Sequence, residues 1–284
     1  MSGNWTFNVD GSPLLQDFLI SLTKQVNDPT AHDLTMYDVM AKRDLAKSKG
    51  HPRCGNLDFG SDYATFAHTL GITSADWSYI FGGHYDIRRS YPVYHSMHDS
   101  FYWMKTFVDP DFKIHLAVAQ YAGLVLLNIA DRPLLPFNTL TLADTMKQNL
   151  RQLKKSNYIK RSGINLAYLS NAIKTFEKAS KRFEREREKL KSDTSFIQLR
   201  VINDQLLQLE RAFIEDKDKY SGNYFKHVLY GPDIENFYAG IFFPRLQRAI
   251  KISAGKDNLQ AVKKQLSLVT YAIFSAAKVL EPVF

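Results

Sequence analysis

Cysteine is almost absent from this chain of 284 residues, because Cys54 is the only one. A single cysteine excludes an intramolecular disulfide and a zinc cluster built from several thiolates. A nucleophilic thiol would need a base beside it, and the segment HPRCGN offers only His51 nearby. We therefore expect Cys54 to be inert rather than catalytic.

The sequence also lacks a positively charged leader and an uninterrupted apolar stretch of membrane-spanning length. The longest apolar segment, residues 114–130, is interrupted by His115, Gln120 and Asn128. It is typical of a core helix rather than of a membrane span.

Charge of one sign does not dominate any long stretch. The net charge is +8, yet basic and acidic residues are mixed, as in residues 174–193. This mixture indicates a solvated helix face, whereas a nucleic-acid interface more often carries an unbalanced basic stripe or a binding motif. We expect no nucleic-acid partner.

What is present predicts a globular chain with one large or two medium domains. The first part combines helices with short strands. A helix is expected from about Ser12, with Pro13 in its first turn, and a second from Ser61 or Asp62. Leu14, Phe18 and Leu22 are expected to be buried in the first helix, and Phe66 and Leu70 to lie on one face of the second. A short aromatic strand is expected over 74–83, so this part reads as an α/β layer.

From residue 138 onward the pattern is helical. A shorter helix is expected from Leu142 to about Leu153, and three longer helices follow it. Their apolar seams are Leu166, Leu169, Ile173, Phe176 and Phe183; then Leu199, Ile202, Leu206, Leu209 and Phe213; then Leu259, Val262, Leu266, Val269, Ile273, Ala276 and Leu280. Such three–four spacing predicts an antiparallel bundle over 138–284, with a domain boundary after residue 137. The long aromatic segment 216–246 is predicted to pack on another domain or to form part of a site.

The segment YPVYHSMHD, residues 91–99, carries the densest group of reactive side chains. Pro92 favours extended backbone before it, and Ser96 with Asp99 fits a capping box, so His95 is expected where a strand ends and a helix begins. A neutral imidazole there can bind zinc, and the hydroxyl of Tyr94 could stabilise an oxyanion. The alternative is a hydrogen-bonded junction histidine beside a packed ring. One histidine by itself defines no metal site.

Several landmarks in one order resemble the glutamate carboxypeptidase II, prostate-specific membrane antigen and transferrin receptor family. They are GNWTFNVDGSPL, GSDYATFAHTLGI, YPVYHSMHDSFYWMKTF, INDQLLQLERAFI and NFYAG. The resemblance implies the C-terminal portion of a zinc-peptidase α/β domain in residues 1–137 and a transferrin-receptor-like helical dimerisation domain in 138–284. It also implies a homodimer and a type II membrane glycoprotein with an extracellular catalytic part.

The resemblance assigns roles to individual residues. His95 matches the last zinc-ligand histidine, and Tyr94 matches the tyrosine that stabilises the tetrahedral intermediate. The positions equivalent to substrate-binding residues are Gly60, Ser61, Asp62, Phe237 and Tyr238. The sequon at Asn4 coincides with a glycosylation position of the family.

The departures from the family pattern are equally informative. The other ligands of the two zinc ions and the general-base glutamate correspond to positions before residue 1, so we do not expect this chain alone to hold zinc or to be active. Phe237 replaces the lysine that reads a glutamate side chain, and Asp76 and Ser78 fall on the arginine patch. Without these cations an acidic substrate would be desolvated with no charged partner, so strict glutamate specificity is not expected. The sequence therefore predicts part of a zinc exopeptidase, a carboxypeptidase or dipeptidase. The alternative is a non-catalytic dimerisation and partner-binding protein.

Overall fold

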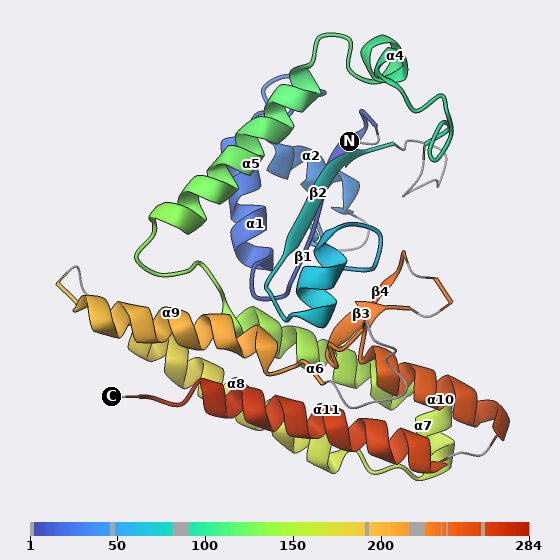
Figure 1. The fold of residues 1–284 in the computed structure, drawn as a ribbon, viewed down its shortest axis with the longest axis vertical. Coiled ribbons are helices and arrows are strands. Elements are labelled where there is room, and N and C mark those ends of the chain that lie inside the picture. Colours follow the sequence, from blue (N-terminus) through green and yellow to red (C-terminus); the bar gives the residue numbers. More distant parts are fainter. Residues whose placement is uncertain are drawn as a thin grey trace. The chain divides into compact units, whose positions relative to one another are not determined.

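The computed structural model describes residues 3–45, 49–81, 91–190, 193–215, 225–233, 235–236, 238–256 and 259–283. They form two compact units, which are shown in Figure 1. Unit 1 comprises residues 1–10, 16–55 and 75–132, and unit 2 comprises residues 11–15, 56–74 and 133–284. Unit 2 therefore takes two short segments from the first part of the chain. The sequence-based boundary after residue 137 stays a prediction.

Unit 1 contains a two-stranded sheet and the helices around it. Its elements are β1 (Thr6–Gly11, whose last residue is assigned to unit 2), α1 (Gln16–Leu22), η1 (Thr23–Gln25), α2 (Met36–Arg43), β2 (Ala75–Ile80), α4 (Phe101–Trp103), η3 (Met104–Val108) and α5 (Lys113–Asp131). β1 pairs with β2, and α5 packs against α1 and β2. In the core the ring of Phe7 lies 5.7 Å from that of Tyr79 and 4.8 Å from that of Tyr121. The expected mixture of strands and helices is thus present.

Two predictions for unit 1 change in detail. The strand expected over 74–83 is β2, but α1 begins at Gln16 rather than at Ser12. Residues 12–15 form a turn instead, in which the Leu15 amide donates to the carbonyl of Ser12 (2.8 Å). The carbonyl of Leu14 accepts a hydrogen bond from the amide of Asn138 (2.8 Å), so this segment is engaged outside α1.

Helix α5 covers the longest apolar segment. Its buried residues include Ile114, Ala117 and Tyr121, and the hydroxyl of Tyr121 donates to the carbonyl of Leu19 (2.9 Å). The opposite side is open, since Leu116, Leu126 and Leu127 are more than half exposed. By length and composition α5 could cross a membrane, although core helices of soluble proteins pass the same test.

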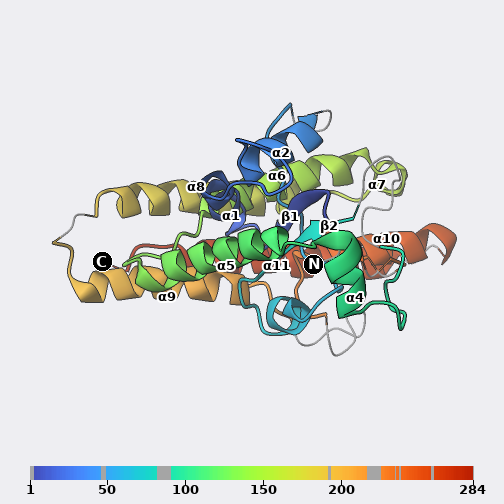
Figure 2. The same cartoon turned by 90° about the horizontal axis from the view of Figure 1, so that it is seen from above.

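Unit 2 is dominated by long helices that run alongside one another (Figures 1 and 2). They are α6 (Thr139–Lys155), α7 (Asn157–Ser162), α8 (Ala167–Glu188), α9 (Phe196–Arg211), α10 (Pro244–Lys256) and α11 (Leu259–Val279). α8 packs against α6 and α11, and α11 also packs against α9 and α10. Most of the predicted seam residues of α8 and α11 are buried, which confirms a helical bundle. α10 was not predicted as a separate helix.

Two small elements of unit 2 differ from the sequence-based expectation. The segment after Asp62 becomes the π-helical η2 (Thr65–Thr69), in which the amide of Leu70 donates to the carbonyl of Thr65 (3.2 Å). The extra residue per turn rotates the side chains relative to an α-helix. Phe66 and Leu70, which were expected to share one face of this helix, are each 50% exposed. Within the aromatic segment 216–246, β3 (Tyr230–Pro232) and β4 (Gly240–Phe242) form an antiparallel hairpin.

Candidate functional site

Tyr94 and His95 lie side by side in a turn of unit 1. Their rings are stacked, with centroids 3.8 Å apart and planes inclined by 22°. His95 is exposed, and its φ of +59° lies in the left-handed region that a residue with a Cβ rarely adopts. Such backbone strain persists only where neighbouring contacts hold it. Tyr91 also stabilises the turn. Its ring centroid lies 5.4 Å from that of Tyr94, and its hydroxyl donates to the carboxylate of Asp99.

The predicted strand-to-helix junction at this point is wrong. The amide of Tyr94 donates to the carbonyl of Tyr91 and that of Ser96 to the carbonyl of Val93, each at 3.0 Å, so residues 91–96 turn rather than extend. The hydroxyl of Ser96 donates to the carbonyl of Val93 (2.7 Å), a local bond that competes with capping. The helix begins later, at Phe101 in α4, where Ser100 is the N-cap.

The side chains around His95 do not complete a zinc site. Structural zinc takes four protein ligands and catalytic zinc about three. Across the described ranges, no three His, Cys, Asp or Glu side chains lie close enough together to hold a metal ion. Within the described ranges, His95 is thus a single candidate ligand, and one imidazole does not make a zinc site.

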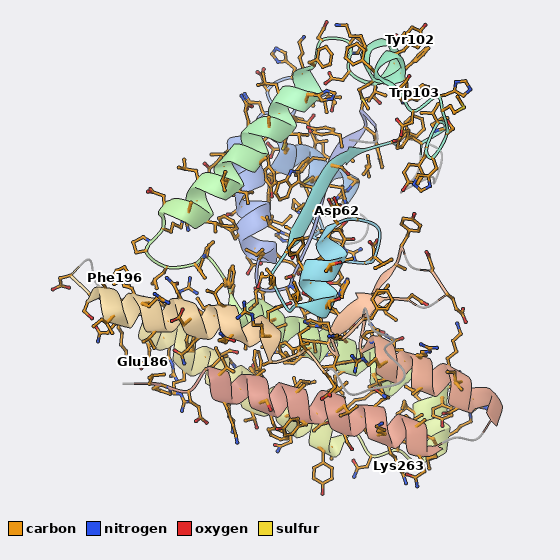
Figure 3. The ribbon with its side chains drawn as sticks, viewed as in Figure 1. Asp62, Tyr102, Trp103, Glu186, Phe196 and Lys263 are labelled. Atoms are coloured by element: carbon orange, nitrogen blue, oxygen red, sulfur yellow. The ribbon has the colours of Figure 1, made fainter. Side chains whose placement is uncertain are left out.

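The predicted substrate-binding turn lies in unit 2, on the segment that leads into η2. Gly60, Ser61 and Asp62 are exposed, and Figure 3 shows Asp62 at the start of the short helical segment. The side chain of Asp58, which is 8% exposed, stabilises this turn. Its Oδ1 accepts a hydrogen bond from the Gly60 amide (2.7 Å) and another from the hydroxyl of Tyr63.

Tyr238, at the tip of the β3–β4 hairpin, meets this turn. A Cβ on Gly60 would stand 3.0 Å from Cδ1 and 3.2 Å from Cε1 of the Tyr238 ring, so the ring packs directly on the glycine backbone. The structure therefore brings together Gly60 and Tyr238, two predicted substrate-binding residues that lie far apart in the sequence. Phe237 lies outside the described residues. Tyr94 and His95 belong to unit 1 and are described separately from this turn.

A buried polar network lies beneath the hairpin. Glu210 of α9 accepts a hydrogen bond from the hydroxyl of Tyr230, and His227 Nε2 lies 3.3 Å from the same carboxylate oxygen. The hydroxyl of Tyr230 also lies 2.8 Å from Oγ of Ser12. Burial, together with the Glu210 carboxylate, raises the pKa of Tyr230 far above its ordinary value, so this phenol stays protonated and can donate.

His68 of η2 belongs to the same buried region. Its side chain is 1% exposed, and its Nε2 lies 2.5 Å from the carbonyl of Asp58. Burial lowers the pKa of His68 from 6.5 to about 4, so the ring is neutral at pH 7. No sequence pattern predicted a role for His68, Glu210, Tyr230 or His227. The only signal for the two histidines is an imidazole that interrupts an apolar run, within AHTLGI and within KHVLYG.

Two further sequence predictions can be placed. Cys54 makes a long contact with the carbonyl of Gly55 (3.8 Å), and burial together with Asp10 and Asp17 raises the pKa of its thiol well above the ordinary value. A thiol of this kind is a poor nucleophile at neutral pH, which favours the inert interpretation. Asn4 is exposed, as a glycan acceptor must be.

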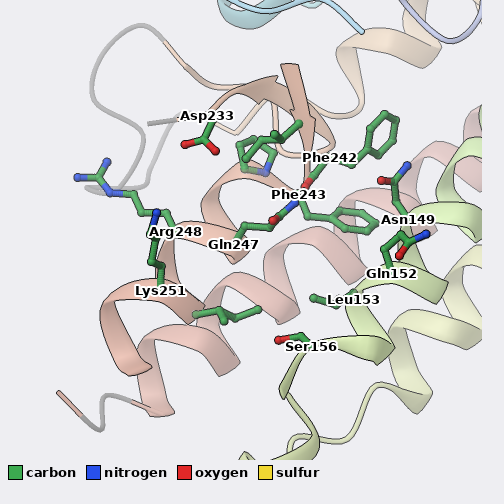
Figure 4. A pocket seen from close by; sticks show the side chains of 13 residues that line it. Asn149, Gln152, Leu153, Ser156, Asp233, Phe242, Phe243, Gln247, Arg248 and Lys251 are labelled. Atoms are coloured by element: carbon green, nitrogen blue, oxygen red, sulfur yellow. Dashed lines mark hydrogen bonds between the residues drawn. The ribbon is translucent and has the colours of Figure 1, made fainter. Parts of the chain in front are cut away.

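A separate pocket of about 370 Å³ lies within unit 2 among α6, β4 and α10 (Figure 4). Its polar lining includes Asn149, Asp233, Gln247, Arg248 and Lys251. None of the site residues predicted from the sequence lines it. The pocket therefore adds nothing to the candidate site.

Comparison with known proteins relates the whole chain to one family. Residues 164–281 match the transferrin receptor-like dimerisation domain. The chain is 34% identical over 99% of its length to the aminopeptidase NAALADL1 of Rattus norvegicus, and 33% identical over 97% to a probable glutamate carboxypeptidase of Arabidopsis thaliana. A glutamate carboxypeptidase 2 homolog of Caenorhabditis briggsae is 28% identical over the whole chain. The chain spans 38% of the length of the first two relatives and 40% of the third. These findings confirm the resemblance to the glutamate carboxypeptidase and transferrin receptor family that the sequence predicted.

Proposed function

We propose that this chain is the C-terminal part of an exopeptidase of the glutamate carboxypeptidase type. In this proposal the turn at Gly60 and the ring of Tyr238 form a wall of the pocket that holds the substrate. Tyr94 donates its hydroxyl to the oxyanion that develops when the peptide carbonyl is attacked. Residues 138–284 mediate homodimerisation, in keeping with the matched dimerisation domain.

The observation that carries the proposal is the packing of Tyr238 on Gly60. The family resemblance assigns both residues to substrate binding, and a Cβ at Gly60 would approach the Tyr238 ring to 3.0 Å. An exposed glycine backbone beside an aromatic face offers a flat surface, which suits a peptide end. Buried Asp58 fixes the turn by accepting the hydrogen bond of the Gly60 amide (2.7 Å), which limits the entropy lost when a substrate binds.

Zinc enters the proposal only as an ion for which His95 would be one ligand. Because the described residues supply no second and third ligand, no chemical step of this chain is assigned to the metal. The relatives are more than twice as long as this chain, and in the proposal their additional length carries the remaining ligands.

The proposed substrate is a peptide with a broad choice of terminal residue. The relatives are named aminopeptidase and glutamate carboxypeptidase, so both classes of exopeptidase occur in the family. The absence of the expected cations at Phe237, Asp76 and Ser78 argues against a pocket built for an acidic side chain.

The second candidate function is a non-catalytic protein that dimerises and binds a partner. The match to the dimerisation domain over 164–281 favours it, together with the single imidazole donor at His95. It differs from the first candidate in one measurable respect: it needs the helices of unit 2 but does not need Tyr94.

A chimera tests the choice. This chain would replace the aligned stretch of the rat aminopeptidase, and hydrolysis of small peptides would be measured with and without a zinc chelator. We expect chelator-sensitive turnover, which Tyr94→Phe lowers about 100- to 1,000-fold, the usual effect of removing one oxyanion donor. Tyr102→Phe, at an exposed tyrosine, is the matched control.

Light scattering and thermal melting of each chimera show whether it is folded and dimeric. Turnover that Tyr94→Phe leaves unchanged would refute the role of that tyrosine. A folded dimer without turnover would refute the exopeptidase proposal and favour the non-catalytic one.

A further inference from the structure

His68 joins two segments that the proposed function places in one pocket wall. The carbonyl of Asp58 can only accept a hydrogen bond, so the contact of 2.5 Å requires a proton on His68 Nε2. The neutral ring then carries a bare lone pair on Nδ1, and this atom is buried without a hydrogen-bond partner. The side chain of His68 is therefore a fixed donor to the turn that presents Gly60.

The main chain of His68 holds the base of the hairpin. Its carbonyl accepts hydrogen bonds from the amides of Lys226 (2.8 Å) and His227 (3.0 Å), just before β3. The rings of Phe59 and Phe225 add an edge-to-face contact, with centroids 4.9 Å apart, between the same two segments. One residue thus connects the turn through its side chain and the hairpin through its backbone.

The hairpin also rests directly on the segment before the turn. A Cβ on Gly240 of β4 would stand 2.7 Å from the carbonyl oxygen of Asn56 and 2.8 Å from that of Leu57. No side chain fits between these backbones, so a shift of residues 56–60 must move β4. Tyr238 precedes this contact by two residues and packs on Gly60.

We propose that His68 is the positioning residue of this wall, holding the Gly60 turn and the Tyr238 hairpin in register through the hydrogen bond from its Nε2 to Asp58. The inference deepens the proposed function and rests on it for the meaning of the wall. The hydrogen bonds themselves do not depend on that function. Removing the donor should loosen both segments together.

The hydrogen bonding of the wall should depend on pH, because the imidazole of His68 can be protonated. The titratable groups around His68 are Asp58 in the turn, Glu210 of α9, and His227 and Tyr230 beside β3. Burial and His227 disfavour a positive charge on the ring, whereas Asp58 and Glu210 favour it, and burial dominates. A proton added at Nδ1 would be buried with no acceptor, so acid should weaken the contacts between the Gly60 turn and the Tyr238 hairpin.

Deuterium exchange of the 284-residue chain tests the proposal without any substrate. Uptake is followed in peptides covering 58–63 and 225–233, corrected for the intrinsic pH dependence of amide exchange, at pH 7 and at pH 4. The variants are His68→Leu, which removes the donor, and His68→Gln, whose side-chain amide can donate to Asp58 but does not titrate. We expect about tenfold faster exchange of both peptides in His68→Leu at pH 7, and protection close to that of the unmodified chain in His68→Gln.

At pH 4 the unmodified chain should lose protection in both peptides, whereas His68→Gln should keep it. If His68→Leu does not fold, this acid comparison decides by itself. Faster exchange in only one peptide, or equal acid sensitivity in His68→Gln, would overturn the proposal. Because no substrate takes part, these results stand apart from the activity of the chimera.

Discussion

Arg187 of α8 should stabilise the chain by binding residues 135–137, which form neither helix nor strand. Its guanidinium donates from Nη1 to the carbonyl of Phe137 (2.5 Å) and from Nη2 to that of Leu135 (3.0 Å). Glu184 pairs with this guanidinium, since its Oε2 lies 3.1 Å from Nη1 of Arg187. Its Oε1 accepts hydrogen bonds from the amide and the hydroxyl of Thr139. The two charged side chains are 20% and 15% exposed, so water reaches them only in part.

The substitution Arg187→Met removes two charge-assisted hydrogen bonds and leaves Glu184 without its cation. Such bonds contribute about 1.5–3 kcal/mol each, and partial access of water places this pair toward the lower end. We expect the free energy of unfolding to fall by about 2–3 kcal/mol. Arg187→Lys should recover only part of the loss, because an ammonium group cannot serve both carbonyls with the planar geometry of a guanidinium.

Urea unfolding at pH 7, followed by circular dichroism, measures the effect. The matched control is Lys189→Met near the same helix end, where Lys189 pairs with Glu186 (2.7 Å) and both side chains are more than half exposed; Glu186 is labelled in Figure 3. An exposed pair of this kind contributes about 0–1 kcal/mol. Equal loss in Arg187→Met and Lys189→Met would show that the two carbonyls gain nothing from the guanidinium, and would refute the reasoning.

Three further predictions concern other parts of the chain. Burial lowers the pKa of His68 from 6.5 to about 4, so the unfolded chain binds more protons than the folded chain between these pH values. The free energy of unfolding should therefore fall by about 3 kcal/mol as the pH drops from 6.5 to 4. Urea titrations should show a smaller pH dependence in His68→Gln, and an unchanged dependence would contradict the prediction. Ile273→Ala, at a fully buried position of α11, should cost about 2–5 kcal/mol in the same assay, whereas Tyr271→Ala, at a 71% exposed position, should cost under about 1 kcal/mol. In secreted expression, Asn4→Gln should remove a glycan-dependent shift in gel mobility, and a mobility identical to that of the unmodified chain would exclude glycosylation there.

The sequence predicted best those elements whose side chains repeat regularly. Leu169, Ile173 and Phe176 of α8 fall at helical spacing and are buried, because a long amphipathic helix gains most by covering one face. Departures from the pattern occurred where a local backbone choice overrode it. Residues 65–69 form a π-helical turn, which a period of 3.6 residues does not predict.

The candidate site was predictable only in part for a similar reason. Gly60 and Tyr238 were found by resemblance to a family, and no local pattern announces their contact. The start of α4 was misplaced because Ser96 and Ser100 are equally good caps in sequence, and the structure uses the second. His68 was missed since its role depends on the carbonyl of Asp58 and on two amides at Lys226 and His227, contacts that only the folded chain creates.

The discontinuous make-up of unit 2 has a consequence for its synthesis. Residues 11–15 and 56–74 leave the ribosome long before α9 and β3, yet they bring Ser12 and His68 to the buried groups Glu210 and Tyr230. Ser12 and His68 cannot meet these groups until nearly the whole polypeptide has been translated, and contacts between such distant residues form slowly. A recombinant fragment that begins at residue 138 would lack both pieces, so Tyr230 would lose its contacts with Ser12 and His68. A fragment designed for expression of unit 2 should therefore include residues 11–15 and 56–74.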